Sequence, residues 1–137
     1  MLPALPHETR RDDRSPGRGT RPRGLAGSTV EDRAHPATAH LTESFLHEDE
    51  WYTFEQSARG PGVRVVARLD ESSYRPRELW KSLAMGDHPI VWSHCPARGR
   101  VFYSALGHGA ETYARPEHAR MLEGALAWAA GLAGKCP

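Results

Sequence analysis

The chain has 137 residues, and its 18 Lys and Arg residues nearly balance its 17 Asp and Glu residues. Because the formal net charge is only +1, no overall positive field points to a nucleic-acid partner. No apolar run approaches the roughly 20 residues that a membrane-spanning helix needs, and no apolar signal segment follows the first residues. We therefore expect a cytoplasmic protein that binds neither nucleic acid nor membrane.

Residues 1–29 have an unusual composition. They contain six Arg, four Pro and four Gly residues and no aromatic residue. Such a segment buries too little apolar surface to offset the entropy lost on ordering. The sequence therefore predicts a disordered tail over residues 1–29 and a folded domain over residues 30–134.

Within the domain, the first expected strands lie in residues 45–54 and 63–69, separated by a turn at Gly60, Pro61 and Gly62. A short helix could begin at Pro76. Two further apolar strands are expected over residues 89–94 and 100–106, both central in the sheet. Only five residues join them, which suits an antiparallel hairpin and is too short for a parallel crossover.

The clearest element is a final helix that begins near Pro116 and ends near Gly131. Pro116 suits the first turn of a helix, with Glu117 beside it. An apolar stripe follows at helical spacing, made of Met121, Leu122, Ala125, Leu126 and Ala129. This pattern predicts a helix with one buried face.

The two cysteines form no recognisable framework. Cys95 lies in the expected hairpin turn without a neighbour that would lower its pKa, and Cys136 lies next to the C-terminus. The sequence predicts two unpaired, unreactive thiols and a reducing compartment.

The hairpin geometry groups the histidines. His88 precedes the first hairpin strand and His108 follows the second, so both are expected at one end, whereas His94 lies at the other. Asp87 and Glu111 would join His88 and His108. Such a group could perform acid–base chemistry, or His88, His108 and Glu111 could bind a divalent metal such as zinc. Alternatively, His108 bonds local backbone and Glu111 caps a turn.

A second candidate region is the acidic run Glu48, Asp49 and Glu50. On a strand, Glu48 and Glu50 would share one face and Asp49 the other. The simplest interpretation is a solvated charge run. The aromatic pair Trp51 and Tyr52 follows directly, however, and aromatics beside carboxylates are typical of a sugar-binding wall.

Several ordered blocks together resemble one known family. They are HPAT at 35–38, DEWYTF at 49–54, VRVVARLDESSY at 63–74, DHPIVWSH at 87–94, GRVFYSALGH at 99–108 and ALAWAAG at 125–131. The series looks like the C-terminal portion of ThuA-like (trehalose utilisation) domains, and it covers about three quarters of the chain.

The resemblance implies an α/β fold of the flavodoxin-like, class I glutamine amidotransferase-like type, with three layers, a C-terminal β-hairpin and a final helix. It also implies a role in disaccharide or keto-sugar metabolism, in some members described as glycosyl hydrolase activity. In amidotransferases of this fold a His-x-Glu pair completes a catalytic triad. His108 and Glu111 are similar to that pair by position, although two residues separate them instead of one.

By this resemblance the N-terminal half of the domain is missing, as expected for a truncated gene product. Exposed strand faces would then favour self-association. The sequence thus predicts a fragment of a carbohydrate-acting enzyme with His108 and Glu111 as catalytic residues. Its expected sugar contacts are Glu50, Tyr52, Asp87, His88 and Tyr113. The alternatives are a non-catalytic sugar-binding or assembly module and an inactive remnant.

Overall fold

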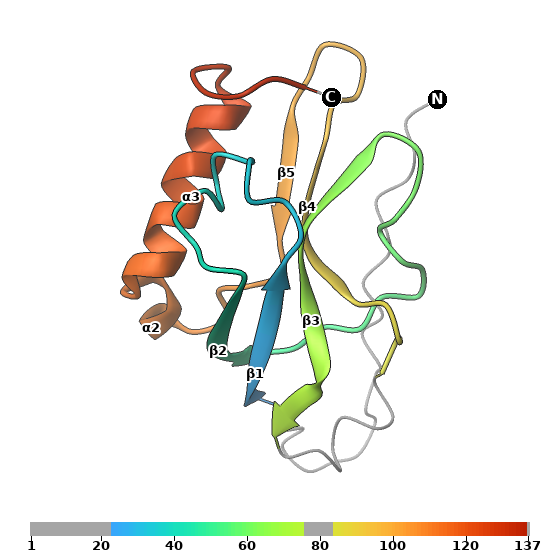
Figure 1. Ribbon diagram of the computed structural model, residues 1–137, viewed down its shortest axis with the longest axis vertical. Coiled ribbons are helices and arrows are strands. Elements are labelled where there is room, and N and C mark those ends of the chain that lie inside the picture. Colours follow the sequence, from blue (N-terminus) through green and yellow to red (C-terminus); the bar gives the residue numbers. More distant parts are fainter. Residues whose placement is uncertain (1–22, 76–83, 137) are drawn as a thin grey trace, which may run out of the picture.

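The computed structural model describes residues 23–75 and 84–136 as a five-stranded sheet with helices at one face (Figure 1). The strands are β1 (Arg23–Val30), β2 (Ser44–Glu50), β3 (Val63–Arg75), β4 (Pro89–His94) and β5 (Val101–Ser104). The helices are α2 (Ala110–Tyr113) and α3 (Pro116–Ala129). The sheet order is β2-β1-β3-β4-β5, and each of these pairings is antiparallel. The edge strands in this sheet are therefore β2 and β5.

The expected hairpin is confirmed, because β4 and β5 pair antiparallel from Val91 opposite Ser104 to His94 opposite Val101. All six residues of β4 are buried, as expected of a central strand. The central position expected for β5 is wrong. Strand β5 lies at the sheet edge, and its residues are only half-buried. They are covered in part because Tyr103 stacks on Trp92, with ring centroids 4.1 Å apart, and Phe102 packs against His35.

The final helix is also confirmed. Pro116 is its first residue, and Gly131 follows its end with a φ of 78°, a left-handed conformation that glycine adopts at helix C-termini. Met121, Ala125 and Trp128 face the sheet and are buried. The short helix expected from Pro76 falls in residues 76–83, outside the described residues.

The predicted tail boundary at residue 29 is wrong, because β1 occupies residues 23–30 and pairs with both β2 and β3. Its inward residues are small, which hid the strand: Gly24, Ala26 and Ser28 are all buried. A side chain at Gly24 would meet the Arg75 carbonyl and the Tyr74 ring. Strand β1 thus has small inward residues, which let its backbone pack closely against the neighbouring strands. Residues 1–22 lie outside the described part of the chain.

The fold class is mixed α/β. Because the described sheet is antiparallel throughout, the expected flavodoxin-like arrangement and the missing half are not confirmed. Helix α3 covers one face of the sheet (Figure 1). Aromatic side chains of Phe54, Trp92 and Tyr103 contact one another edge-on or stacked within the core. Among the described residues, no helix has the length and apolar character needed to cross a membrane.

The prediction of two unpaired cysteines is wrong, because Cys95 and Cys136 form a disulfide. The two residues are 41 positions apart in sequence. Helix α3 runs back along the sheet and returns the C-terminal segment to the β4–β5 turn (Figure 1). That long-range return could not be seen from residue spacing. The disulfide also removes the cysteine-based argument for a reducing compartment, since disulfides persist mainly in oxidising ones.

Thiol titration tests this pairing. In the denatured, unreduced chain, we expect no reactive thiol, and after reduction we expect both Cys95 and Cys136 to react. Closing a loop of this length contributes roughly 3–4 kcal/mol in the chain-entropy model, so reduction should lower the free energy of unfolding measurably in urea. Two reactive thiols before reduction would contradict the pairing.

A second prediction concerns Gly124 on α3. A Cβ there would meet the Pro36 carbonyl group and lie 2.8 Å from the Ala37 Cα. In an exposed helix, Gly→Ala stabilises by up to about 1 kcal/mol, but here we expect Gly124→Ala to destabilise by about 1–3 kcal/mol through overpacking. Urea denaturation would measure the change. The control is Gly60→Ala, because a Cβ at Gly60 meets nothing within 4 Å; a stabilised Gly124→Ala would refute the close packing.

Candidate functional site

The carboxylate of Asp49 joins strand β2 to the turn that follows β5. Its Oδ2 accepts hydrogen bonds from the Gly107 amide at 2.8 Å and from His47 Nε2 at 3.1 Å. Its Oδ1 accepts from the amides of His108 at 3.0 Å and Glu50 at 2.9 Å. Asp49 is buried, and four donors satisfy its two oxygens, so the ionised form is well solvated by the protein.

This hydrogen bonding governs the acidity of Asp49. Burial raises the pKa of Asp49, but the hydrogen bonds from His47, Gly107, Glu50 and His108 outweigh it and lower the pKa to about 2. Asp49 is therefore ionised throughout the physiological range. Its charge fixes the position of the 107–108 backbone.

The turn held in this way carries His108, whose imidazole pairs with Glu50. His108 Nδ1 lies 2.6 Å from Glu50 Oε2. The Tyr52 hydroxyl donates to the same oxygen at 2.9 Å. Glu50 is 2% exposed, whereas the His108 side chain is 39% exposed. The pair thus combines a buried carboxylate with an imidazole that reaches solvent.

This arrangement has a definite chemical capacity. A carboxylate at Nδ1 selects the tautomer in which Nδ1 carries the hydrogen, so the Nε2 lone pair of His108 is available to accept a proton. The carboxylate of Glu50 also stabilises the imidazolium that results, as in the acid–base pairs of hydrolases. The His108–Glu50 pair can therefore act as a general base and then as a general acid.

The predicted pairing of His108 with Glu111 is not observed. The Glu111 side chain is 69% exposed and pairs with Arg23 of β1 at 3.3 Å. The carboxylate partner of His108 comes instead from the end of β2, 58 positions earlier, because Asp49 docks that strand end against the turn. Glu50 and Tyr52, predicted as sugar contacts, are thus the residues that orient His108.

The predicted site residues Asp87 and His88 contact other residues rather than the imidazole of His108. Asp87 binds Arg59 at 2.7 Å. His88 is fully buried, with Nδ1 2.8 Å from Glu71 and Nε2 2.8 Å from the Tyr52 carbonyl oxygen. The His88 ring therefore holds the backbone of Tyr52, whose hydroxyl bonds Glu50. The hairpin does bring the backbones of residues 88 and 108 to one end of the sheet, but their side chains serve different partners.

The same contacts bear on the predicted metal set of His88, His108 and Glu111. Each of the three is engaged with a different protein group: Glu71, Glu50 and Arg23, respectively. Within residues 23–75 and 84–136, no group of three or more His, Cys, Asp or Glu side chains is arranged to hold a metal ion. The described residues thus offer a histidine–carboxylate pair rather than a metal centre.

The interpretation of Glu48, Asp49 and Glu50 as a solvated run is correct only for Glu48. Asp49 and Glu50 are both buried at the end of β2, where Asp49 bonds the 107–108 backbone and Glu50 pairs with His108. Sequence reasoning missed Asp49 as the anchor. One signal could have pointed to it: His47 and Asp49 share a strand face with the apolar Phe45.

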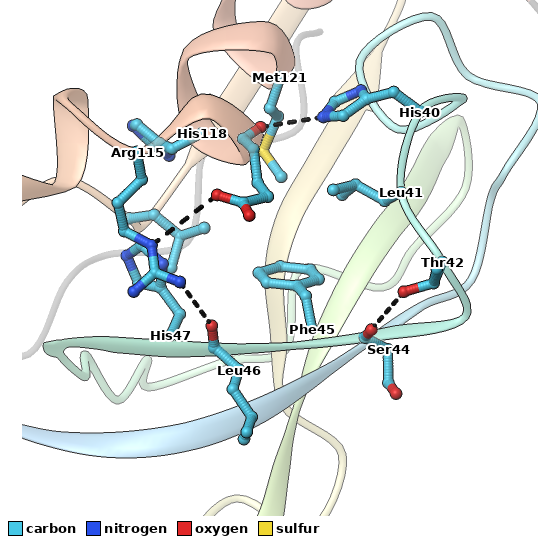
Figure 2. Close-up of a pocket in the computed structure, with 12 residues that line it drawn as sticks. His40, Leu41, Thr42, Ser44, Phe45, Leu46, His47, Arg115, His118 and Met121 are labelled. Carbon is cyan, nitrogen blue, oxygen red and sulfur yellow. Dashed lines mark hydrogen bonds and ion pairs between the residues drawn. The ribbon is translucent and has the colours of Figure 1, made fainter.

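Close to the anchor lies a pocket of about 410 Å³ between β2, the 40–44 segment and the start of α3 (Figure 2). Phe45, Leu41 and Met121 provide apolar lining, and His47 and His118 lie at one end (Figure 2). The exposed Tyr113 ring contacts the His118 ring edge-on at 5.3 Å. Its hydroxyl would be 2.6 Å from a Cβ at Gly107, so Tyr113, predicted as a sugar contact, does lie against the turn.

The anchor can be tested by pH-dependent unfolding of Asp49→Asn. Because the folded pKa of Asp49 is about 2 and its ordinary value is 3.8, its ionisation stabilises the fold above pH 3.8, and this contribution falls as pH decreases towards 2. The shift corresponds to about 2 kcal/mol. We expect Asp49→Asn to be less stable in urea at pH 6 and the difference from wild type to shrink by pH 2.

The matched control is Glu48→Gln, which removes the neighbouring exposed acid on the same strand. It should change stability by less than about 0.5 kcal/mol. Equal stability losses in the two variants, or a loss in Asp49→Asn that is independent of pH, would argue against the anchor.

Comparisons with known proteins place the chain in a family. A solved ThuA-like protein from Bacteroides uniformis matches with a TM-score of 0.62 and 25% identity, over 79% of this chain and 44% of that one. A second, from Parabacteroides merdae, matches with a TM-score of 0.56 and 24% identity, over 82% and 41%. The chain thus spans less than half the length of these proteins. No match was found among curated proteins. The model of the ThuA family, described as trehalose utilisation, matches residues 10–129, and the chain therefore belongs to the ThuA family.

Proposed function

We propose that this chain acts in the utilisation of trehalose or a related disaccharide or keto-sugar, as part of a carbohydrate-acting enzyme. The observation that carries the proposal is the 2.6 Å contact between His108 Nδ1 and Glu50 Oε2. It turns an imidazole on a solvent-facing turn into an oriented acid–base group. Membership of the ThuA family, described as trehalose utilisation, supports the choice of substrate class.

The chemistry follows from the pair. In a keto-sugar, the hydrogen on the carbon beside the carbonyl group is acidic enough for a positioned imidazole to remove. His108 Nε2 would take that proton while the electron pair moves into the carbonyl group to give an enediolate, and the imidazolium would return a proton on the same or the neighbouring atom. Glu50 would stabilise the imidazolium, and the Tyr52 hydroxyl holds Glu50 in place.

Three exposed side chains near the turn suit a sugar. Tyr113 is 54% exposed and lies against Gly107, so its ring face can stack on a pyranose. Glu111 and Arg23 form an exposed ion pair close by, and both can bond hydroxyl groups. In this proposal Tyr113 and Glu111 contact the sugar, while His108 reacts.

A second candidate function is a non-catalytic sugar-binding or assembly module. The exposed side chains of Leu25 on β1 and Leu46 on β2 favour it. Leu25 lies opposite Glu48 and Leu46 opposite Gly27, so both leucines project from the same face of the sheet. An exposed apolar pair on an edge region is suited to self-association or to contact with another chain.

Hydrogen–deuterium exchange of the substrate distinguishes the two functions. Incubation of the full chain with a trehalose-derived keto-sugar in D₂O should place deuterium next to the carbonyl group, as followed by proton NMR. We expect His108→Ala to slow exchange by about 10²–10⁴-fold, the usual contribution of a general base. Glu50→Gln should slow it less, because it removes only the charge that orients His108.

The control variant is Glu48→Gln, which lies outside the pair and should exchange as wild type does. Exchange that is unchanged in His108→Ala would refute the assignment of His108. If wild type gives no exchange above buffer but calorimetry shows saturable sugar binding, the binding module replaces the enzyme.

A further inference from the structure

The ring of His88 lies between two hydrogen-bond acceptors. Its side chain is fully buried. Nδ1 lies 2.8 Å from Glu71 Oε1, and Nε2 lies 2.8 Å from the carbonyl oxygen of Tyr52. A carbonyl oxygen can only accept a hydrogen bond, and so can an ionised carboxylate. Both ring nitrogens must therefore donate, and the imidazolium is the form of histidine that has two N–H groups.

The other contacts of Glu71 keep it ionised. Its Oε1 accepts the Met85 amide at 2.5 Å, and its Oε2 accepts the Gly86 amide at 3.1 Å. Burial raises the pKa of Glu71, but the hydrogen bonds from these amides and from the His88 ring outweigh it and lower the pKa below its ordinary value. Glu71 is therefore a carboxylate near neutral pH, and the hydrogen between it and His88 belongs to the ring.

The charged groups around the ring suit an imidazolium. Glu71 of β3 and Asp87, the residue before His88, both interact electrostatically with the ring. Asp87 also interacts with Arg59 and Arg68, and Arg59 bonds it at 2.7 Å. A buried charge is costly unless it is paired and its donors are used. The two acceptors on the ring meet both conditions.

We propose that His88 is a positioning residue for the His108–Glu50 pair and performs this role only as an imidazolium. In the neutral ring, one nitrogen carries a lone pair that would face an acceptor at 2.8 Å. The bond to the Glu71 carboxylate is the stronger of the two because its acceptor is charged. The hydrogen that leaves is therefore the one on Nε2, and the bond to the Tyr52 carbonyl oxygen is lost with it.

The loss of this bond reaches the pair through the Tyr52 side chain. The Tyr52 hydroxyl donates to Glu50 Oε2 at 2.9 Å, and the same oxygen lies 2.6 Å from His108 Nδ1. A displaced Tyr52 would hold Glu50 less firmly against His108. The bearing of this change on catalysis rests on the proposed function, whereas the coupling between the His88 ring and the pair rests on these contacts alone.

NMR of the full, oxidised chain tests the coupling, with pH varied from about 5 to 8, the range in which imidazoles change charge. At the acidic end we expect hydrogens on both ring nitrogens of His88. As pH rises, Nε2 should lose its hydrogen, and the carbonyl carbon shift of Tyr52 should change with the same midpoint. A single ring hydrogen at the acidic end, two at the alkaline end, or a loss without a change at Tyr52 would overturn the proposal.

Variants separate His88 from the other histidines. In His108→Ala the Tyr52 carbonyl shift should still follow the His88 ring. In His88→Gln that shift should no longer depend on pH, because an amide does not titrate in this range; a dependence that persists would contradict the proposal. The matched control is His40→Gln, since His40 Nε2 also contacts a backbone carbonyl oxygen, that of Glu117 on α3, at 3.0 Å. It should leave the Tyr52 titration unchanged. Should His88→Gln fail to fold, wild type and His108→Ala decide the question.

The keto-sugar exchange assay adds a readout of function. Wild type loses the bond to Tyr52 as pH rises, whereas His88→Gln does not change. The ratio of the wild-type exchange rate to that of His88→Gln should therefore fall about tenfold across the range, the effect expected for one hydrogen bond. A ratio independent of pH would indicate a purely structural role and refute positioning by charge. Absence of exchange in wild type would count against the proposed function, and the NMR titration would still decide the role of His88.

Discussion

The buried carboxylate of Asp49 links the two edges of the sheet, and the arrangement of the site depends on this contact. In the order β2-β1-β3-β4-β5, the edge strands β2 and β5 are separated by three strands. Asp49 at the end of β2 nevertheless accepts the amides of Gly107 and His108, just after β5. A flat sheet could not make this contact, so the sheet must curl until its edges meet at that end. The low pKa of Asp49 reflects how fully its donors compensate for burial.

The contact between the edges also explains why a histidine and a glutamate far apart in sequence form a pair. Glu50 follows Asp49 directly, and His108 follows Gly107, so docking one residue of each pair brings the next residues together. His88 supports the arrangement from the centre of the sheet by bonding the Tyr52 backbone. Asp49, Glu50, Tyr52, His88 and His108 are thus joined by hydrogen bonds and ion pairs at this end of the sheet.

Sequence reasoning identified the local elements well because their patterns are local. The five-residue link between residues 94 and 100 was enough to predict an antiparallel hairpin, and Pro116 marked the start of α3. The predictions that were wrong involve residues that are far apart in the sequence. The small residues of β1 gave no apolar signal, Cys136 met Cys95 only after α3 returned, and Glu111 resembled the partner of His108 by spacing although Glu50 takes that place. Spacing predicts neighbours along the chain, but it cannot predict which sheet edges will meet.

The position of the pair bears on what the longer family members could add. This chain spans less than half the length of its solved relatives. Within the described residues, the contacts of Asp49 and Glu50 that orient His108 join residues between 47 and 108. The exposed face that carries Leu25 and Leu46 lies on β1 and β2, the strands next to this contact. In the described residues, the orientation of the imidazole is set where the end of β2 meets the turn after β5.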